Sequence, residues 1–214
     1  MTMNLKSVIG IIFSLDVLIV ILHIVFGKDN AILNLDGENN LPATYSFLKL
    51  VVVGIIAFVI FFTNGNKCLR KWSKSLLWIP FGSLFIYLGF DELFTIHEKT
   101  IGYLEPSLLV GLGWFSNHVF YWVPLFLPLI ILAIAMFYLL IKNLLEDFSL
   151  PRKLFIAGTV SFFMVIVSEF VGGFLEGGMG YAVMTLEESF EIFGASLFLV
   201  GLLVYRKQAE RLIV

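Results

Sequence analysis

Cysteine and charge are both scarce in this sequence. Cys68 is the single cysteine among 214 residues. A disulfide within the chain is therefore excluded, and so is a cysteine cluster for zinc or iron–sulfur. Charged residues make up 14%, against about a quarter in soluble globular proteins. The net charge of -2 gives no sign of a nucleic-acid partner, and we expect none.

Several catalytic motifs are missing as well. There is no phosphate-binding glycine motif, no Gly-x-Ser-x-Gly elbow and no heme-attachment pair. These absences remove the sequence support for nucleotide binding, for a serine hydrolase of that type and for covalently attached heme. Chemistry, if present, must come from other residues.

Apolar residues dominate instead. Hydrophobic types make up 59%, and the mean hydropathy is +0.97. A span needs roughly 20 residues, so the chain has room for about six spans and short connections. The sequence predicts an all-α integral membrane bundle of about six transmembrane helices, forming one domain over residues 1–214. The expected spans are Ser7–Phe26, Tyr45–Phe62, Ser75–Thr95, His118–Ile141, Leu154–Val171 and Leu186–Tyr205.

The segments between these runs have the composition of loops. Residues 172–180 contain five glycines and predict a loop before the last span. Lys99–Asn117 is too short in its apolar part to span, so we expect an interfacial or re-entrant segment. The tryptophans, Trp78 among them, are expected in belts at the two membrane interfaces. Most phenylalanines are expected to face lipid.

The basic residues predict the orientation. In a six-span arrangement eleven of the 14 lysines and arginines fall on one side, and Lys28, Lys49 and Lys99 fall on the other. The positive-inside rule then places both termini in the cytoplasm. We expect the inner (cytoplasmic) membrane of a bacterium. The eleven are Lys6, Lys67, Arg70, Lys71, Lys74, Lys142, Arg152, Lys153, Arg206, Lys207 and Arg211.

The acidic residues show the opposite distribution. Of 16 acids, Glu146, Asp147 and Glu210 are on the cytoplasmic side, and thirteen are in outer loops or inside helices. Apart from mid-span Asp16, those inside helices are near outer ends. All three histidines, His23, His97 and His118, are also at outer helix ends. This asymmetry predicts a functional site on the extracytoplasmic side.

The third apolar run ends in a group of polar side chains. At 100° per residue Asp91, Thr95 and Glu98 fall on one stripe, with Glu92 at its edge. His97 joins this stripe only if the helix unwinds before it. The segment is therefore the first place to look for ligands.

The sixth run supplies a second group. Glu187, Glu188 and Glu191 lie within an arc of about 100° on one helix face. An alternative for Glu187 and Glu188 is that they are helix N-terminal charges after Thr185, favoured by the helix dipole. Glu191 is deeper in the membrane, where an ionisable group usually has a function.

Four or five carboxyl groups at one depth cannot all remain ionised. Lys49 and Lys99 are too few to neutralise them, so either protons or a bound cation must do so. We hypothesise a divalent metal ion, for which zinc, manganese, iron and calcium all suit such ligands. The alternative is a proton-sharing cluster without metal. The expected ligands are Asp91, Glu92, Glu191 and His23, with Glu188, Glu98, Glu169 and His97 in reserve.

Two resemblances extend this interpretation. The segments Asn34-Leu-Asp36-Gly-Glu38, Leu-Gly-Phe-Asp91-Glu92 through His97-Glu98, and Glu187-Glu188 through Glu191 with Gly194 resemble a type of bacterial multi-pass membrane protein, which implies no activity. The chain is also chemically similar to the ceramidase and progestin-receptor-like superfamily, whose zinc is held by three histidines and an aspartate. It lacks that superfamily's His-x-x-x-His pair, so the activity is not transferred.

Three functions are compatible with this pattern. The first is a metal-dependent membrane enzyme acting on a lipid-like substrate from the outer face. The second is a transporter or channel for protons or divalent cations, although the inner half of the bundle offers almost no polar relay. The third is a non-catalytic subunit that docks a membrane-protein partner or forms a homo-oligomer.

Overall fold

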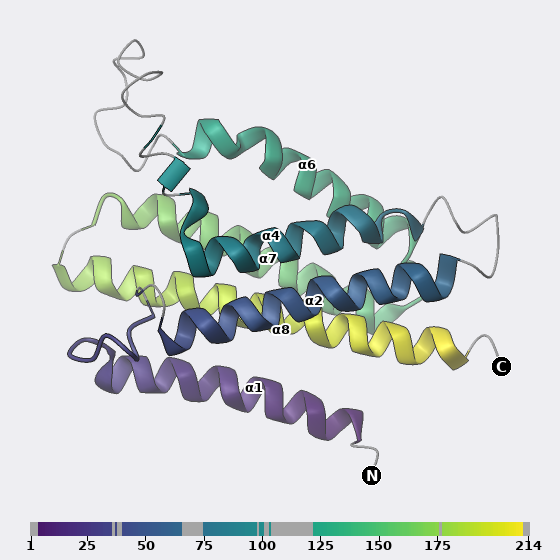
Figure 1. Ribbon diagram of the computed structural model, residues 1–214, viewed down its shortest axis with the longest axis horizontal. Helices are drawn as coiled ribbons and strands as arrows, with labels where there is room; N and C mark the ends of the chain where they lie inside the picture. The colour runs from purple at the N-terminus through teal and green to yellow at the C-terminus, as the bar shows by residue number, and fades with distance from the viewer. Residues whose placement is uncertain are drawn as a thin grey trace.

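The computed structural model of this chain consists of long helices packed side by side (Figure 1). The structure describes residues 4–35, 37, 40–65, 75–97, 99–100, 103, 122–175 and 177–211. Across these ranges there are helices and no strand. The elements are α1 (Leu5–Leu22), a π-helical turn η1 (His23–Gly27), α2 (Leu41–Gly65), α4 (Trp78–Phe94), α6 (Trp122–Asn143), α7 (Ser149–Gly172) and α8 (Gly177–Arg211).

Five of the described helices are long and apolar enough to cross a membrane. They cover Leu5–Gly27, Leu41–Thr63, Phe126–Asn143, Ser149–Gly172 and Gly177–Glu210. The α4 helix, with 17 residues, is a little shorter than a usual span. Large apolar side chains cover the outward surfaces of these helices. The prediction of a helical protein with helices suited to a lipid bilayer is thus confirmed for the described residues.

The last helix is longer than predicted. α8 runs for 35 residues from Gly177, so the prediction of a loop as far as Gly180 was wrong. The chain instead turns between Gly172 and Leu175. Glu187 and Glu188 consequently lie about ten residues inside α8, and their interpretation as N-terminal charges is wrong, because the dipole acts within the first turn. Of the expected interfacial segment, only residues 99, 100 and 103 are described.

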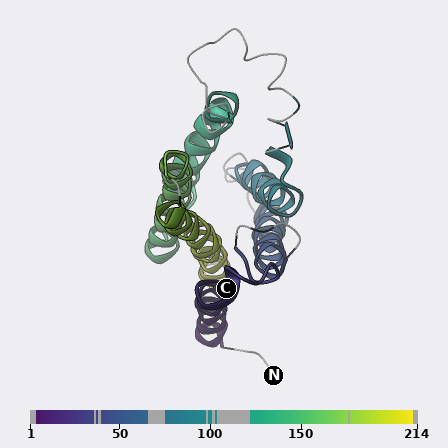
Figure 2. The same cartoon turned by 90° about the vertical axis from the view of Figure 1, so that its left-hand side faces the viewer.

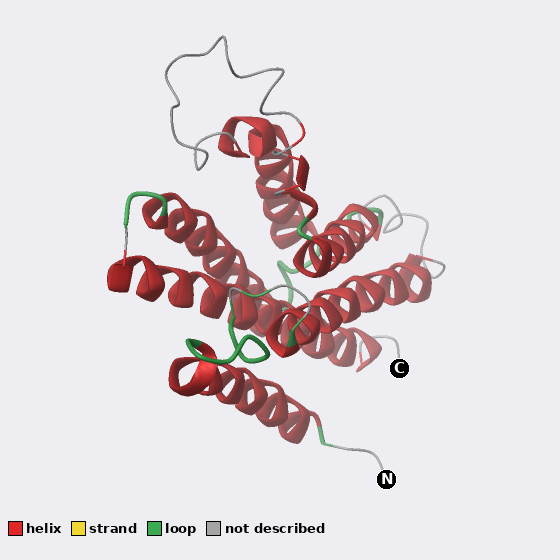
Figure 3. Ribbon diagram, turned by 60° about the vertical axis from the view of Figure 1, so that its left-hand side comes forward, coloured by secondary structure: helices red, strands yellow, loops and turns green. Residues whose placement is uncertain are grey.

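Close helix packing fixes the bundle. α4 packs along α2, α7 packs along α8, and α2 joins these two pairs through α8. Figure 2 views the bundle along its length, with α6, α7 and α8 on one side and α2 and α4 on the other. Figure 3 shows the first helix, next to the N label, at the edge of the bundle. Gly54 and Gly82 permit the contact of α2 with α4, since a Cβ on Gly54 would lie 2.7 Å from Gly82 O. Small residues at such crossings are typical of membrane helices.

The core is aromatic and fills the half of the bundle nearest the chain ends. Trp78, Phe81, Phe85, Phe155 and Phe198 are all fully buried and their rings contact one another. Trp78 therefore belongs to the core, and its predicted place in an interfacial belt is wrong. The expectation that phenylalanine mostly faces lipid fails for the Phe residues of this cluster. Their rings form an aromatic core beyond the polar end of α4.

Candidate functional site

The polar end of α4 is shaped by a sharp change in backbone direction. Thr95 adopts a left-handed conformation, with φ 46° and ψ 50°, and ends the helix after Phe94. The chain then folds back, so that the His97 N–H donates to Asp91 Oδ1 at 2.7 Å. His97 Nδ1 also lies 2.7 Å from Asp91 Oδ2. The unwinding needed to bring His97 to the acidic stripe is therefore present.

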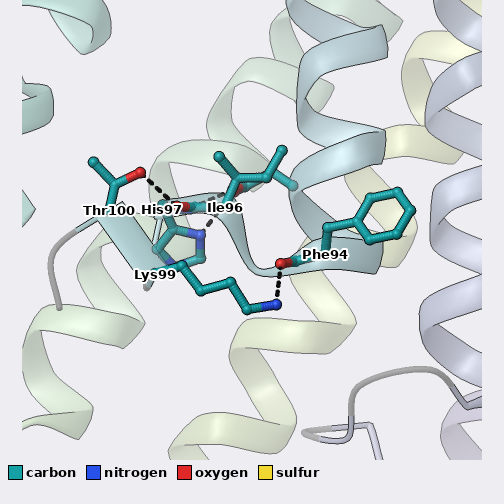
Figure 4. A network of polar contacts seen from close by, with 6 residues as sticks. Phe94, Ile96, His97, Lys99 and Thr100 are labelled. Atoms are coloured by element: carbon teal, nitrogen blue, oxygen red, sulfur yellow. Dashed lines mark hydrogen bonds and ion pairs between the residues drawn. The ribbon is translucent and has the colours of Figure 1, made fainter. Parts of the chain in front are cut away.

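Two further contacts hold this turn in place. Lys99 Nζ donates to the Phe94 carbonyl at 2.7 Å, and Thr100 Oγ1 donates to the Ile96 carbonyl at 2.7 Å. Figure 4 shows these side chains around His97. A cation on a C-terminal carbonyl is favourable, because the last carbonyls of a helix lack intrahelical partners. The side chains of His97 and Asp91 keep 35% and 15% of their surface exposed, so solvent or a ligand can reach the pair.

Glu92 and Glu191 form the centre of the site. They come from α4 and α8, and their side chains lie close enough for a hydrogen bond between them. Two ionised carboxylates have only acceptors, so such a bond requires a proton on one of them. Asp91 lies close enough to add negative potential at both, while His97 and Lys49 add positive potential at Glu191. The cluster therefore has an excess of acid that a shared proton or a cation must offset.

A buried ion pair lies next to Glu191. Lys49 Nζ is 2.6 Å from Asp16 Oδ1, and it also donates to the carbonyl of Ile192 at 2.8 Å. Tyr45 OH donates to the same Asp16 oxygen at 2.6 Å, and the Lys49 ammonium lies 4.3 Å from the centroid of its ring. These contacts join α1, α2 and α8 at one point inside the membrane.

The second oxygen of this carboxylate is unusual. Asp16 Oδ2 is buried without a hydrogen-bond partner in the described part of the chain, as are Ser196 Oγ and Tyr181 OH. An unsatisfied buried carboxylate oxygen lowers the free energy of unfolding, by on the order of 1–3 kcal/mol. Such groups are commonly found where a water or an ion completes the site. Asp16 therefore belongs to the polar centre and not to the inert core.

Both ring nitrogens of His23 have hydrogen-bond partners. Its Nδ1 accepts the Leu35 N–H at 3.0 Å, and its Nε2 lies 3.1 Å from Thr185 Oγ1. Thr185 donates its own hydroxyl hydrogen to the Tyr181 carbonyl, so Nε2 must be the donor to Thr185. These contacts fit the tautomer that carries its proton on Nε2. Binding a metal through His23 would require one of these hydrogen bonds to break.

The other predicted ligands have different positions. Glu188 is one turn from Glu191 on the same side of α8, and Glu169 lies in the last turn of α7; both side chains are partly buried. Glu98 lies outside the described residues. Among the residues that the structure describes, no three histidines, cysteines or acids are arranged to hold a metal ion. Of the expected ligands, the structure joins Asp91 to His97 and brings Glu92 close to Glu191.

The Asp16–Lys49 pair was missed as part of the site. The signal was present, because Asp16 and Lys49 are the only charged residues inside their apolar runs. Charges within spans normally pair with each other. The pair was missed because the two residues lie on different helices. Considered separately, Asp16 is an isolated acid within a span, and Lys49 is a single positive charge near the acidic groups.

Comparisons with known proteins give a family without an activity. No curated protein and no solved structure matches the chain. One family model, described as a domain of unknown function (DUF8692), matches residues 11–205. This stretch contains every candidate ligand of the acidic site. The chain therefore belongs to the DUF8692 family.

Proposed function

We propose that the chain crosses the membrane six times and presents its acidic site on the extracytoplasmic side of a bacterial inner membrane. Five spans are long enough by themselves, and α4 runs parallel to them in the same bundle (Figure 1). The start of α1 and the end of α8 lie at the same end of the bundle, as an even number of crossings requires. The excess of lysine and arginine at that end supports a cytoplasmic position.

At the opposite end, we propose a site that binds one divalent cation between Asp91, Glu92 and Glu191. The observation that carries this proposal is the proximity of the Glu92 and Glu191 side chains, which interact electrostatically across α4 and α8. Two acids from different helices, with a third beside them, need a shared proton or a cation to stay together, and we assign the cation. His97 supports the arrangement by fixing Asp91 through two hydrogen bonds, as outer partners commonly do for metal-binding carboxylates.

The corresponding function is a metal-dependent enzyme acting on a lipid-like substrate. A bound metal would supply an activated water, with a neighbouring carboxylate as the base. Phe90 and Phe94 support a lipid substrate, because both are exposed beside Asp91 and their rings stack at 6.1 Å. They offer an apolar surface that leads from the bilayer to the acids. The buried aromatic core between this site and the opposite end argues against a route straight through the bundle.

Cation or proton transport is the second candidate, favoured by the buried Asp16–Lys49 pair. Lys49 contributes positive potential at Glu191 and bonds Asp16, so it connects the acidic end to a point deeper in the bilayer. Ionisable chains of this kind are used in proton relays. Such a chain needs an exit past the buried phenylalanines.

Metal content of the purified protein tests the site. We expect the wild type to retain about one divalent ion, and Glu92→Gln and Glu191→Gln to lose it and to lose the rise in melting temperature that the ion gives. Asp29→Asn is the matched control, since it removes an exposed acid from the same end of the molecule. Wild type without metal, with stability unchanged or raised in both Gln variants, would indicate a proton-sharing pair.

A second measurement separates the two functions. Metal-loaded protein in liposomes of mixed phospholipids should convert lipid to a product detectable by mass spectrometry, and Glu191→Gln should not. Uptake of the cation into sealed liposomes, with no lipid product, would contradict the enzyme function and support transport.

A further inference from the structure

A cavity of about 210 Å³ lies at the other end of the bundle, where α6 ends and α7 begins. It is lined by Tyr138, Ile141, Lys142, Glu146 and Arg152. Figure 1 shows that the connection between α6 and α7 lies at the opposite end of the bundle from the end of α4, and Lys142, Arg152 and Lys153 lie near it in the sequence. The lining of the cavity thus combines two cationic side chains, one acidic side chain, a phenol and an apolar side chain.

The backbone around this cavity is anchored to the core. Leu145, in the turn between the two helices, is fully buried. The ring of Phe148 packs on Tyr205 of α8 with a centroid distance of 4.8 Å. The Arg152 N–H is bonded to the Phe148 carbonyl at 2.9 Å. The helix ends that bear Lys142 and Arg152 are therefore held in place before any ligand arrives.

Both cations are available to a ligand. Lys142 Nζ has a weak contact of 3.5 Å with Tyr138 OH and lies 5.6 Å from the centroid of that ring. Neither Lys142 nor Arg152 forms an ion pair with another described residue, Glu146 included. The α7 N-terminus lacks a side-chain cap from Phe148, which leaves positive helix-end potential next to Arg152. An anion is the expected ligand.

The surface beside the cavity indicates what the anion is attached to. On α7, Ile156, Val160 and Phe163 follow Arg152 at helical spacing, lie on the same face and are exposed. On α6, Ile134 and Ile131 lie on the same face as Tyr138 and are also exposed. Each stripe runs from the basic end toward the middle of the bilayer. Acyl chains attached to the bound group would lie along these stripes.

We propose that this cavity binds the phosphodiester group of an anionic phospholipid. Arg152 is suited to two parallel hydrogen bonds with a phosphate, and Lys142 adds a point charge. Glu146 reduces the formal charge of the lining to one positive unit, which matches a phosphodiester better than a doubly charged free phosphate. Basic pockets between spans on the cytoplasmic side commonly take such head groups.

Thermal unfolding of the full chain in neutral detergent tests this site. Short-chain phosphatidylglycerol should raise the melting temperature in a concentration-dependent way, whereas inorganic phosphate and short-chain phosphatidylcholine should give much smaller shifts. The double variant Lys142→Gln/Arg152→Gln should weaken the phosphatidylglycerol effect by about tenfold in concentration. Glu146→Gln should strengthen it, which keeps the site testable if the double variant folds poorly.

A matched control separates this cavity from general attraction of the basic end for anions. Lys6→Gln/Lys207→Gln removes two exposed charges from the same end but outside the cavity, and it should keep the wild-type response. Equal weakening in both double variants would overturn the proposal. An equal response to inorganic phosphate would also overturn it, because it would assign the site to free phosphate.

Discussion

The ammonium group of Lys49 lies 2.6 Å from Asp16 Oδ1, with 4% and 0% of the two side chains exposed. The pair connects α1 to α2, and the bond from Lys49 to the Ile192 carbonyl extends the connection to α8. α1 otherwise meets the bundle mainly along α8. This one contact therefore has a large part in holding the first helix in place.

Removal of both charges should be less damaging than the sum of the two single removals. Asp16→Asn or Lys49→Met leaves one buried charge without its partner, at a cost of about 3–5 kcal/mol in free energy of unfolding. The double variant Asp16→Asn/Lys49→Met should lose less than the sum of the two. Chemical unfolding in detergent measures this double-mutant cycle. Additive losses would show that the two side chains act independently.

The crossing of α2 and α4 should be sensitive to a single methyl group. A Cβ on Gly54 would lie 2.7 Å from Gly82 O, and a Cβ on Gly82 would lie 2.9 Å from Gly54 O. Because backbone atoms are the obstacle, Gly54→Ala should lower stability by about 1–3 kcal/mol. Gly10→Ala is the control, since nothing lies within 4 Å of its added Cβ. Its stability should be equal or higher by up to about 1 kcal/mol.

Thr95 should prefer replacement by glycine over alanine. Its φ of 46° costs a residue with a Cβ about 1–2 kcal/mol, and glycine avoids this cost. Both replacements lose the hydroxyl, so the difference between Thr95→Gly and Thr95→Ala isolates the backbone effect. We expect the glycine variant to be more stable by about 1 kcal/mol. At Gly10, in a regular helix, the order of the same two residues should be reversed.

Much of the fold follows from hydropathy alone, because a bilayer admits only helices or closed barrels. The apolar runs place α1, α2 and α4 within a few residues of their observed positions. α8 was misjudged because its first turns contain three glycines, which are poor helix formers. Packing against α7 outweighs that preference. The burial of Trp78 and the phenylalanine core depends on which helices meet, and a single run of sequence does not contain that information.

The candidate site was predictable where the residues share a helix. The stripe of Asp91 and Glu92 and the face of Glu191 follow from helical periodicity. The meeting of Glu92 with Glu191 depends on packing between α4 and α8. The ion pair of Asp16 with Lys49 likewise joins helices whose relative placement the sequence does not state.

His23 should carry its proton on Nε2 and remain neutral. Leu35 N–H occupies Nδ1 at 3.0 Å, and a proton on that nitrogen would point at another donor. Nitrogen-15 NMR of labelled protein distinguishes the two tautomers and the charged ring. Thr185→Val removes the acceptor of Nε2 and should shift the Nε2 signal more than the Nδ1 signal. A doubly protonated ring at neutral pH would contradict this assignment.

Cysteine labelling should determine the orientation of the whole bundle. Cys68 is the only native cysteine, so Cys68→Ser gives a background without thiols. In that background Asp29→Cys and Gly178→Cys, both exposed near the acidic end, should react with a membrane-impermeant reagent added to intact cells. Ser149→Cys, exposed at the start of α7, should react only after the cells are opened. This pattern is expected because lysine and arginine gather at the end that contains Ser149, and such residues are retained in the cytoplasm.

Labelling of Ser149→Cys in intact cells would show that the protein has the opposite orientation, with the acidic cluster on the cytoplasmic side. Opposite results for Asp29→Cys and Gly178→Cys would instead contradict an even number of spans between α1 and α8.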